Sequence, residues 1–195
     1  DCSEKMALNN NLNLVMEDEF SCFGPNSFDL ILSNLNLHLI NDIEGHLNQV
    51  KSLLKPGGLM VFSFFGEENL KELKAVLLKT EQKFYGGITP RMAPNIDIKS
   101  AGMLLAKVGF VNSVAQKYSF EVNYQNPQRL FKDLKNMGEG NVLNLRSRKF
   151  ITRNFLLELT KLYQESFGQK NDQSLATFEI IILSGWKKRS EEHTS

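Results

Sequence analysis

One histidine stands where an α/β protein usually places its chemistry. His38 lies just past an apolar run, residues 28–32, which turn-forming residues bound and which is typical of a buried strand. Ligands of open α/β sheets bind outside the carboxyl ends of the strands. An imidazole at that position can orient a substrate or act as a base near neutral pH. His38 is therefore a candidate catalytic residue, and the alternative is that it packs at the end of a helix.

Ser33, Asn34 and Leu35 directly follow the same apolar run. A second apolar run starts at residue 59 and ends near residues 64–66. If the two runs are neighbouring parallel strands, their carboxyl ends meet at one edge of the sheet. These two segments are therefore the expected place of a binding site.

Acidic residues follow two earlier candidate elements. Glu17, Asp18 and Glu19 come directly after a short strand candidate, residues 12–16, and could bind a metal, contact an adenine amino group or face solvent. No nearby histidine or aspartate pattern completes a metal site, so no metal is expected. Asp1 opens a strand-to-helix segment, where an acid can accept hydrogen bonds from ribose hydroxyls or simply cap the helix.

One arginine lies in an irregular loop. Residues 84–94 are too rich in glycine and proline for regular structure, and they place Arg91 among apolar and aromatic neighbours. Its guanidinium could hold a substrate carboxylate bidentately under a lid, or form a surface salt bridge. No Ser-His-Asp, Cys-His or metal-binding pattern is readable in the chain.

The composition limits the functions that these residues can serve. The chain has 195 residues, a formal net charge of +1 and two cysteines. The near-zero charge gives no case for a nucleic-acid-binding surface, and two cysteines are too few for a disulfide scaffold. No apolar run reaches the roughly 20 residues that a membrane span needs, and no signal-peptide pattern occurs. We expect a protein that is not membrane-spanning, in a reducing compartment.

The segment from residue 26 to residue 65 organises the predicted fold. A helix follows the first strand, with Asn41 or Asp42 as its N-cap and Lys51 and Lys55 in its last turns. Its apolar residues recur every three or four positions, as an amphipathic helix requires. Residues 56–58, Pro-Gly-Gly, stop the helix before the second strand. A helix between two buried strands is a right-handed βαβ unit, so the fold class is α/β.

The remaining elements follow from periodicity and capping residues. We expect helices over residues 67–82, 97–107, 127–135 and 152–166, and strands over residues 114–122 and 176–186. Asp97 and Thr152 are the expected N-caps, and Gly109 the expected C-cap. Residues 189–195 are expected to be a non-native tail or a polar terminus outside the fold.

The motifs together resemble the class I S-adenosylmethionine (SAM)-dependent methyltransferases. They are EDEF over residues 17–20, NSFDLILSNLNLH over residues 26–38 and LKPGG over residues 54–58. GITPR, DLKNMGEGN and ATFEI, which start at residues 87, 133 and 176, are similar to the mitochondrial complex I assembly factors that modify an arginine. A sister group in this branch is the malonyl-carrier-protein O-methyltransferases of biotin synthesis.

The resemblance implies a Rossmann-like, seven-stranded sheet that is mostly parallel, with an antiparallel last strand. The domain would span residues 1–188, with a helical insertion at about 126–168. The family's first strand and glycine-rich loop would precede Asp1, so this chain would be a partial and inactive domain.

By the same resemblance, Asp1 would hold the ribose of SAM, and Glu17 and Asp18 would read its adenine. Residues 33–35 would line its methionine end. The substrate would be a protein or carrier protein, including a complex I subunit, in the mitochondrial matrix or the bacterial cytoplasm. Arginine hydroxylation and a non-catalytic assembly role are the alternatives. Leu39 stands in place of the family's usual tryptophan, which puts the substrate pocket in doubt.

Overall fold

The computed structural model describes residues 23–87, 95–138, 151–169 and 173–189. Within them, four strands form one sheet in the order β1-β2-β4-β3. The strands are β1 (Phe28–Ser33), β2 (Leu54–Phe65), β3 (Phe110–Tyr124) and β4 (Ser174–Lys187). β1 and β2 are parallel, whereas β4 runs antiparallel to both β2 and β3. The predicted α/β class and the antiparallel last strand are confirmed.

The predicted βαβ unit is present, with one error at its second junction. Asp42 caps α2 (Ile43–Leu53) by accepting a 2.8 Å hydrogen bond from the amide of Gly45. The helix ends at Leu53, so Lys55 belongs to β2 and not to a helical turn. A residue before proline is held in the extended region, which places Lys55 in the strand ahead of Pro56. The Lys55 ammonium instead lies 2.7 Å from the Asp29 carboxylate on β1.

Four further helices confirm most of the expected caps. They are α3 (Lys71–Tyr85), α4 (Ile98–Val108), α5 (Pro127–Asn136) and α6 (Arg153–Phe167). Asp97 and Thr152 cap α4 and α6 with their side chains. Gly109 ends α4 with a φ of +85°, in the left-handed region that favours glycine. The helix expected from residue 67 begins only at Lys71, because residues 66–70 form a turn bonded to β4.

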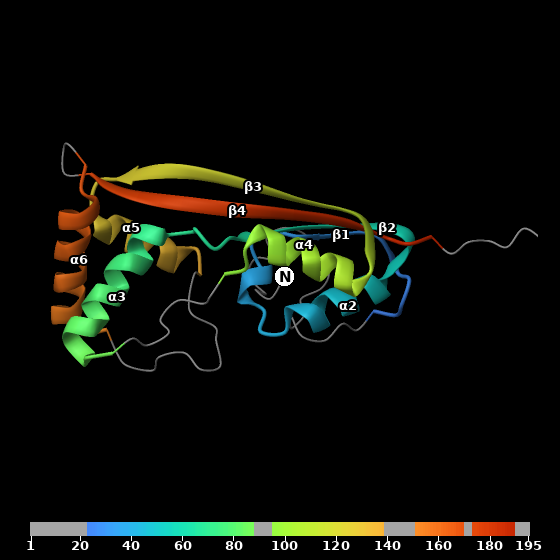
Figure 1. Cartoon of the computed structure of the whole chain (residues 1–195), viewed down its shortest axis with the longest axis horizontal. Helices are drawn as coiled ribbons and strands as arrows, with labels where there is room; N and C mark the ends of the chain where they lie inside the picture. Colours follow the sequence, from blue (N-terminus) through green and yellow to red (C-terminus); the bar gives the residue numbers. More distant parts are fainter. Residues whose placement is uncertain (1–22, 88–94, 139–150, 170–172, 190–195) are drawn as a thin grey trace, which may run out of the picture.

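The sheet and helices enclose two cores. The first lies between the sheet and α2 and α4, and the second between the far ends of β3 and β4 and the helices α3, α5 and α6. Figure 1 shows β3 and β4 running along the molecule, with the two helical groups at opposite ends. The chain passes from the first core to the second between Phe64 and Phe65, at the carboxyl end of β2.

One face of β1 is open among the described residues. The expected strand was covered on both faces, but the side chains of Leu30 and Leu32 are 48% and 67% exposed. On the opposite face, Ile31 packs against the first core. The prediction of full coverage is wrong for this part of the chain, because α2 and α4 cover one side of the sheet only. None of the described helices has the length and apolar character needed to cross a membrane.

Candidate functional site

The carboxyl ends of β1 and β2 lie side by side, as predicted. Ser33 at the end of β1 pairs with Phe62 of β2 in the parallel register. The Ser63 hydroxyl accepts a 3.0 Å hydrogen bond from the amide of Leu35 and donates a 2.6 Å one to the Asn34 side-chain oxygen. Ser33, Asn34 and Leu35 are therefore brought together and tied to the neighbouring strand.

The Asn34 side chain is bonded through its carbonyl oxygen. That oxygen accepts from the Ser63 hydroxyl, which itself accepts from the Leu35 amide. The amide nitrogen of the exposed Asn34 side chain is then the end that presents hydrogen-bond donors. A ligand carboxylate at this edge of the sheet would meet a donor and not an acceptor.

Leu35 adopts a backbone conformation that leucine rarely takes. Its φ is +50°, in the left-handed region, and such a conformation costs a non-glycine residue about 1–2 kcal/mol. The bond to Ser63 and packing of the leucine side chain against the second core hold it there. Strain of this kind gathers at functional sites, where the surrounding structure enforces it.

His38 lies beside the end of β2. It belongs to the short 3-10 helix η1 (Leu37–Leu39). Its ring packs edge-on against the ring of Phe65, with 5.0 Å between the two ring centroids. The structure thus brings the candidate imidazole to the same edge of the sheet as residues 33–35. A catalytic role for His38 stays a prediction, since packing against Phe65 fits the alternative equally well.

The turn after β2, residues 66–70, is bonded to β4 through its backbone. The Gly66 amide donates to the Glu179 carbonyl at 3.0 Å, which continues the antiparallel ladder past the end of β2. The Leu70 amide donates to the Thr177 carbonyl at 2.7 Å. Leu70 is buried and has a φ of +54°, so this turn also contains a leucine in the left-handed region.

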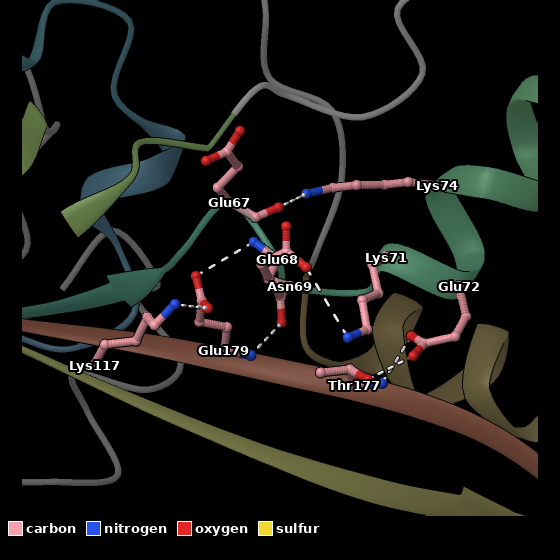
Figure 2. Close-up of polar contacts among 9 residues, drawn as sticks. All are labelled: Glu67, Glu68, Asn69, Lys71, Glu72, Lys74, Lys117, Thr177 and Glu179. Carbon is pink, nitrogen blue, oxygen red and sulfur yellow. Dashed lines mark hydrogen bonds and ion pairs between the residues drawn. The ribbon is translucent and has the colours of Figure 1, made fainter. Parts of the chain in front are cut away.

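One buried carboxylate binds this turn directly, and a second binds the β4 residue to which the turn is bonded (Figure 2). Glu72 and Glu179 are each only 2% exposed. Glu72 accepts hydrogen bonds from both the amide and the hydroxyl of Thr177. Glu179 accepts a 3.3 Å bond from the amide of Glu68 and forms a 3.0 Å ion pair with Lys117 of β3. The sequence prediction missed both, although an acid inside the apolar run ATFEIIIL was a usable signal.

Burial around the turn also changes two protonation equilibria. Burial lowers the pKa of Lys74, although three nearby carboxylates act in the opposite direction. Its ammonium donates a 2.6 Å hydrogen bond to the backbone carbonyl of Glu67. Burial, and then the carboxylate of Glu72, raise the pKa of Tyr163 far above its ordinary value.

Four candidate residues lie outside the described part of the chain. They are Asp1, Glu17, Asp18 and Arg91. Their assigned contacts with ribose, adenine and a substrate carboxylate therefore stay predictions. Among the described residues, no three histidine, cysteine or acidic side chains lie close enough to hold a metal ion.

Comparisons with known proteins point to one family. A family profile described as a methyltransferase domain matches residues 2–62. RP459 of Rickettsia prowazekii, named as a candidate methyltransferase, is 32% identical over 161 residues, which are 83% of this chain and 71% of that protein.

Two further relatives carry more specific names. The mitochondrial arginine-hydroxylase NDUFAF5 of Dictyostelium discoideum is 37% identical over 172 residues, covering 88% of this chain and 39% of the relative. A malonyl-acyl-carrier-protein O-methyltransferase of Methylovorus is 32% identical over 164 residues, which cover 84% of this chain and 53% of the relative. The chain spans about half the length of these curated relatives.

The fold itself matches a solved structure. A protein of Bacillus halodurans, titled as a candidate methyltransferase, superposes with a TM-score of 0.57 at 14% identity, covering 92% of this chain and 79% of that one. At this identity the likeness shows the fold alone, an α/β methyltransferase fold of which four strands are described here.

Proposed function

Because this chain belongs to the class I SAM-dependent methyltransferase family, we propose that the whole protein binds SAM and methylates an acidic or carrier-bound acceptor. The observation that carries the proposal is the pair of adjoining turns at the carboxyl ends of β1 and β2. A doubly wound sheet binds its ligand at such a place.

The residues of the first turn fit the methionine end of SAM. The exposed Asn34 amide presents donors, and the cofactor's carboxylate is an acceptor. The left-handed Leu35 and the Ser63 hydroxyl hold that amide in place before any ligand arrives. By the family resemblance, Asp1 would hold the ribose and Glu17 and Asp18 the adenine.

Methyl transfer needs positioning more than a dedicated nucleophile. When bound, SAM would supply a methyl group that an acceptor oxygen or nitrogen attacks in line with the carbon–sulfur bond, with the neutral thioether S-adenosylhomocysteine as the leaving group. A rigid site contributes by holding the two reactants in that geometry. His38, whose ring contacts Phe65, would orient the acceptor or take its proton. Arg91 would bind the carboxylate of an acidic acceptor.

The similarity to arginine-hydroxylases favours a second candidate function. The five NDUFAF5 relatives are 32% to 37% identical to this chain, and each is named as mitochondrial. On this proposal the whole protein uses dioxygen and a two-electron reductant to insert one oxygen atom into an arginine of a complex I subunit, with the second oxygen atom leaving as water, or it supports assembly without catalysis. Its compartment would then be the mitochondrial matrix, whereas a bacterial methyltransferase would act in the cytoplasm.

We further propose that this chain alone is a partial domain with little activity. The exposed side chains of Leu30 and Leu32 support the idea, because a preceding segment could cover that face of β1. The glycine-rich half of the cofactor site would lie in the same segment. Calorimetry tests this directly, since sub-micromolar SAM binding by the 195-residue chain would contradict it.

The whole protein can be tested with candidate acceptors and mass spectrometry. It is incubated in air with SAM, a two-electron reductant and either malonyl-acyl-carrier protein or an arginine-containing complex I subunit. A mass gain of one methyl group replacing a hydrogen supports methylation, and a gain of one oxygen atom supports hydroxylation. SAM binding with no mass change on either acceptor would overturn the catalytic proposals in favour of an assembly role.

A further inference from the structure

The turn after β2 joins the two cores of the molecule. Phe64 belongs to the core under α2 and α4, and Phe65 to the core under α3, α5 and α6. Residues 66–70 then lead directly into α3, which begins at Lys71. The conformation of this turn therefore sets where α3 lies relative to the candidate site.

Glu179 forms three hydrogen bonds with this turn. Its carbonyl accepts from the Gly66 amide, and its carboxylate accepts from the Glu68 amide. Its own amide donates to the Asn69 side-chain oxygen at 3.2 Å. Figure 2 shows the carboxylate between Lys117 on one side and the backbone of the turn on the other.

The fit between Glu179 and the turn is tight. A methyl group added at Gly66 would collide with the Glu179 carboxylate oxygen and would crowd Ile181. Gly66 does not have a positive φ, so its lack of a side chain is a matter of space and not of backbone conformation. The carboxylate of Glu179 thus occupies the space that a side chain at position 66 would need.

The ion pair between the buried Glu179 and the half-exposed Lys117 adds little to stability. Desolvating a carboxylate is costly, and well-packed apolar replacements of buried pairs are often neutral or stabilising. What a carboxylate offers that an apolar side chain does not is a fixed acceptor for the Glu68 amide. The role that fits Glu179 best is therefore to fix the geometry of the turn.

We propose that Glu179 is a positioning residue for the acceptor side of the site, an inference that rests on the proposed methyltransferase function. The turn that it fixes follows Phe65, whose ring contacts His38, and leads into the helical group α3, α5 and α6. The Asn34 turn, by contrast, is held by Ser63 and makes no hydrogen bond to Glu179 within the described residues. Loss of Glu179 should disturb acceptor binding and leave SAM binding intact.

Two substitutions at one position separate the carboxylate's roles. In the whole protein, Glu179→Gln keeps an oxygen acceptor for the Glu68 amide, whereas Glu179→Leu removes it. We expect Glu179→Leu to speed hydrogen exchange over residues 66–70 about tenfold, the effect of losing one hydrogen bond to a charged group. We also expect a several-fold higher acceptor KM, an unchanged SAM Kd, and recovery of both properties in Glu179→Gln. Glu121→Leu and Glu121→Gln, on the exposed part of β3, are the matched controls.

A second variant keeps the test decisive if Glu179→Leu does not fold. Gly66→Ala displaces the carboxylate but retains every polar group, and it should reproduce the faster exchange and the raised acceptor KM. Unchanged exchange over residues 66–70 in both variants would overturn the proposal. An equal loss of SAM and acceptor binding would also overturn it. Exchange and SAM affinity do not depend on turnover, so they decide the matter even if no methyl transfer is found.

Discussion

The two turns at the candidate site are built in opposite ways. The turn after β1 is partly exposed and is held by one neutral hydroxyl, that of Ser63. The turn after β2 is held by two buried carboxylates: Glu179 of β4 accepts from it directly, and Glu72 of α3 holds Thr177, whose carbonyl accepts from the Leu70 amide. The first turn is suited to binding a ligand that enters and leaves. The second turn is suited to holding the acceptor in a fixed position.

Removing the Glu72 carboxylate should have the largest effect on this difference. Glu72→Ala leaves the amide and hydroxyl of Thr177 buried without their acceptor, and each such group costs about 1–3 kcal/mol. We therefore expect the free energy of unfolding to fall by about 3 kcal/mol in urea denaturation. Glu121→Ala on the exposed β3 is the control and should stay within about 0.5 kcal/mol of wild type. A decrease in the free energy of unfolding below 1 kcal/mol for Glu72→Ala would show that this carboxylate does not stabilise the second turn.

The two left-handed leucines offer a direct comparison of the turns. Glycine relieves the backbone strain at both positions, but only Leu70 is fully buried, whereas Leu35 is partly exposed. Leu70→Gly should destabilise the protein by about 2.5 kcal/mol, the loss of a buried leucine less the relieved strain. Leu35→Gly should cost under about 1 kcal/mol by the same reasoning. Equal losses of stability for Leu70→Gly and Leu35→Gly in thermal unfolding would contradict the proposed difference between the two turns.

The open face of β1 can be tested by comparing two chain lengths. Leu32 is 67% exposed here, so Leu32→Ser should leave the stability of the 195-residue chain almost unchanged. If a preceding segment covers this face in the whole protein, the same substitution should cost about 2 kcal/mol there. Denaturation curves of both lengths give the comparison. A similar small change in both would contradict the covered face.

The pH dependence of the free energy of unfolding should reflect the burial of Lys74. We expect this effect to be smaller than those of the substitutions above. Its pKa is lowered in the folded state, so between that pKa and the ordinary value of lysine the unfolded chain binds more protons. Stability should therefore rise with pH across this alkaline window and be reduced below it, where the partly buried ammonium is charged. Lys74→Met should flatten the rise in urea denaturation curves measured at successive pH values. An unaltered pH profile would show that Lys74 is not desolvated as the structure indicates.

Local patterns in the sequence were enough to predict the first turn and its framework. Apolar periodicity and capping residues located the βαβ unit, Asp42, Asp97 and Thr152, since those signals act over one helical turn. Lys55 is an exception, because helical spacing favours the helix there but the extended preference of a residue before proline prevails and places it in β2.

The second turn depends on contacts that no local pattern contains. The bond from Thr177 to Glu72 spans 105 positions in the sequence, and that from Glu179 to Asn69 spans 110. A burial pattern can suggest that an acid lies inside a strand, but not which distant amide it meets. The left-handed Leu35 and Leu70 were also beyond prediction, because leucine has no intrinsic preference for that region.

The most direct test of this account is calorimetric titration of SAM into the whole protein carrying Ser63→Ala or Glu179→Leu. Ser63→Ala releases Asn34 and Leu35, so SAM affinity should fall several-fold, about the worth of one hydrogen bond. Glu179→Leu should bind SAM as tightly as wild type. Full affinity in Ser63→Ala, or a matching loss in Glu179→Leu, would contradict the division into a cofactor turn and an acceptor turn.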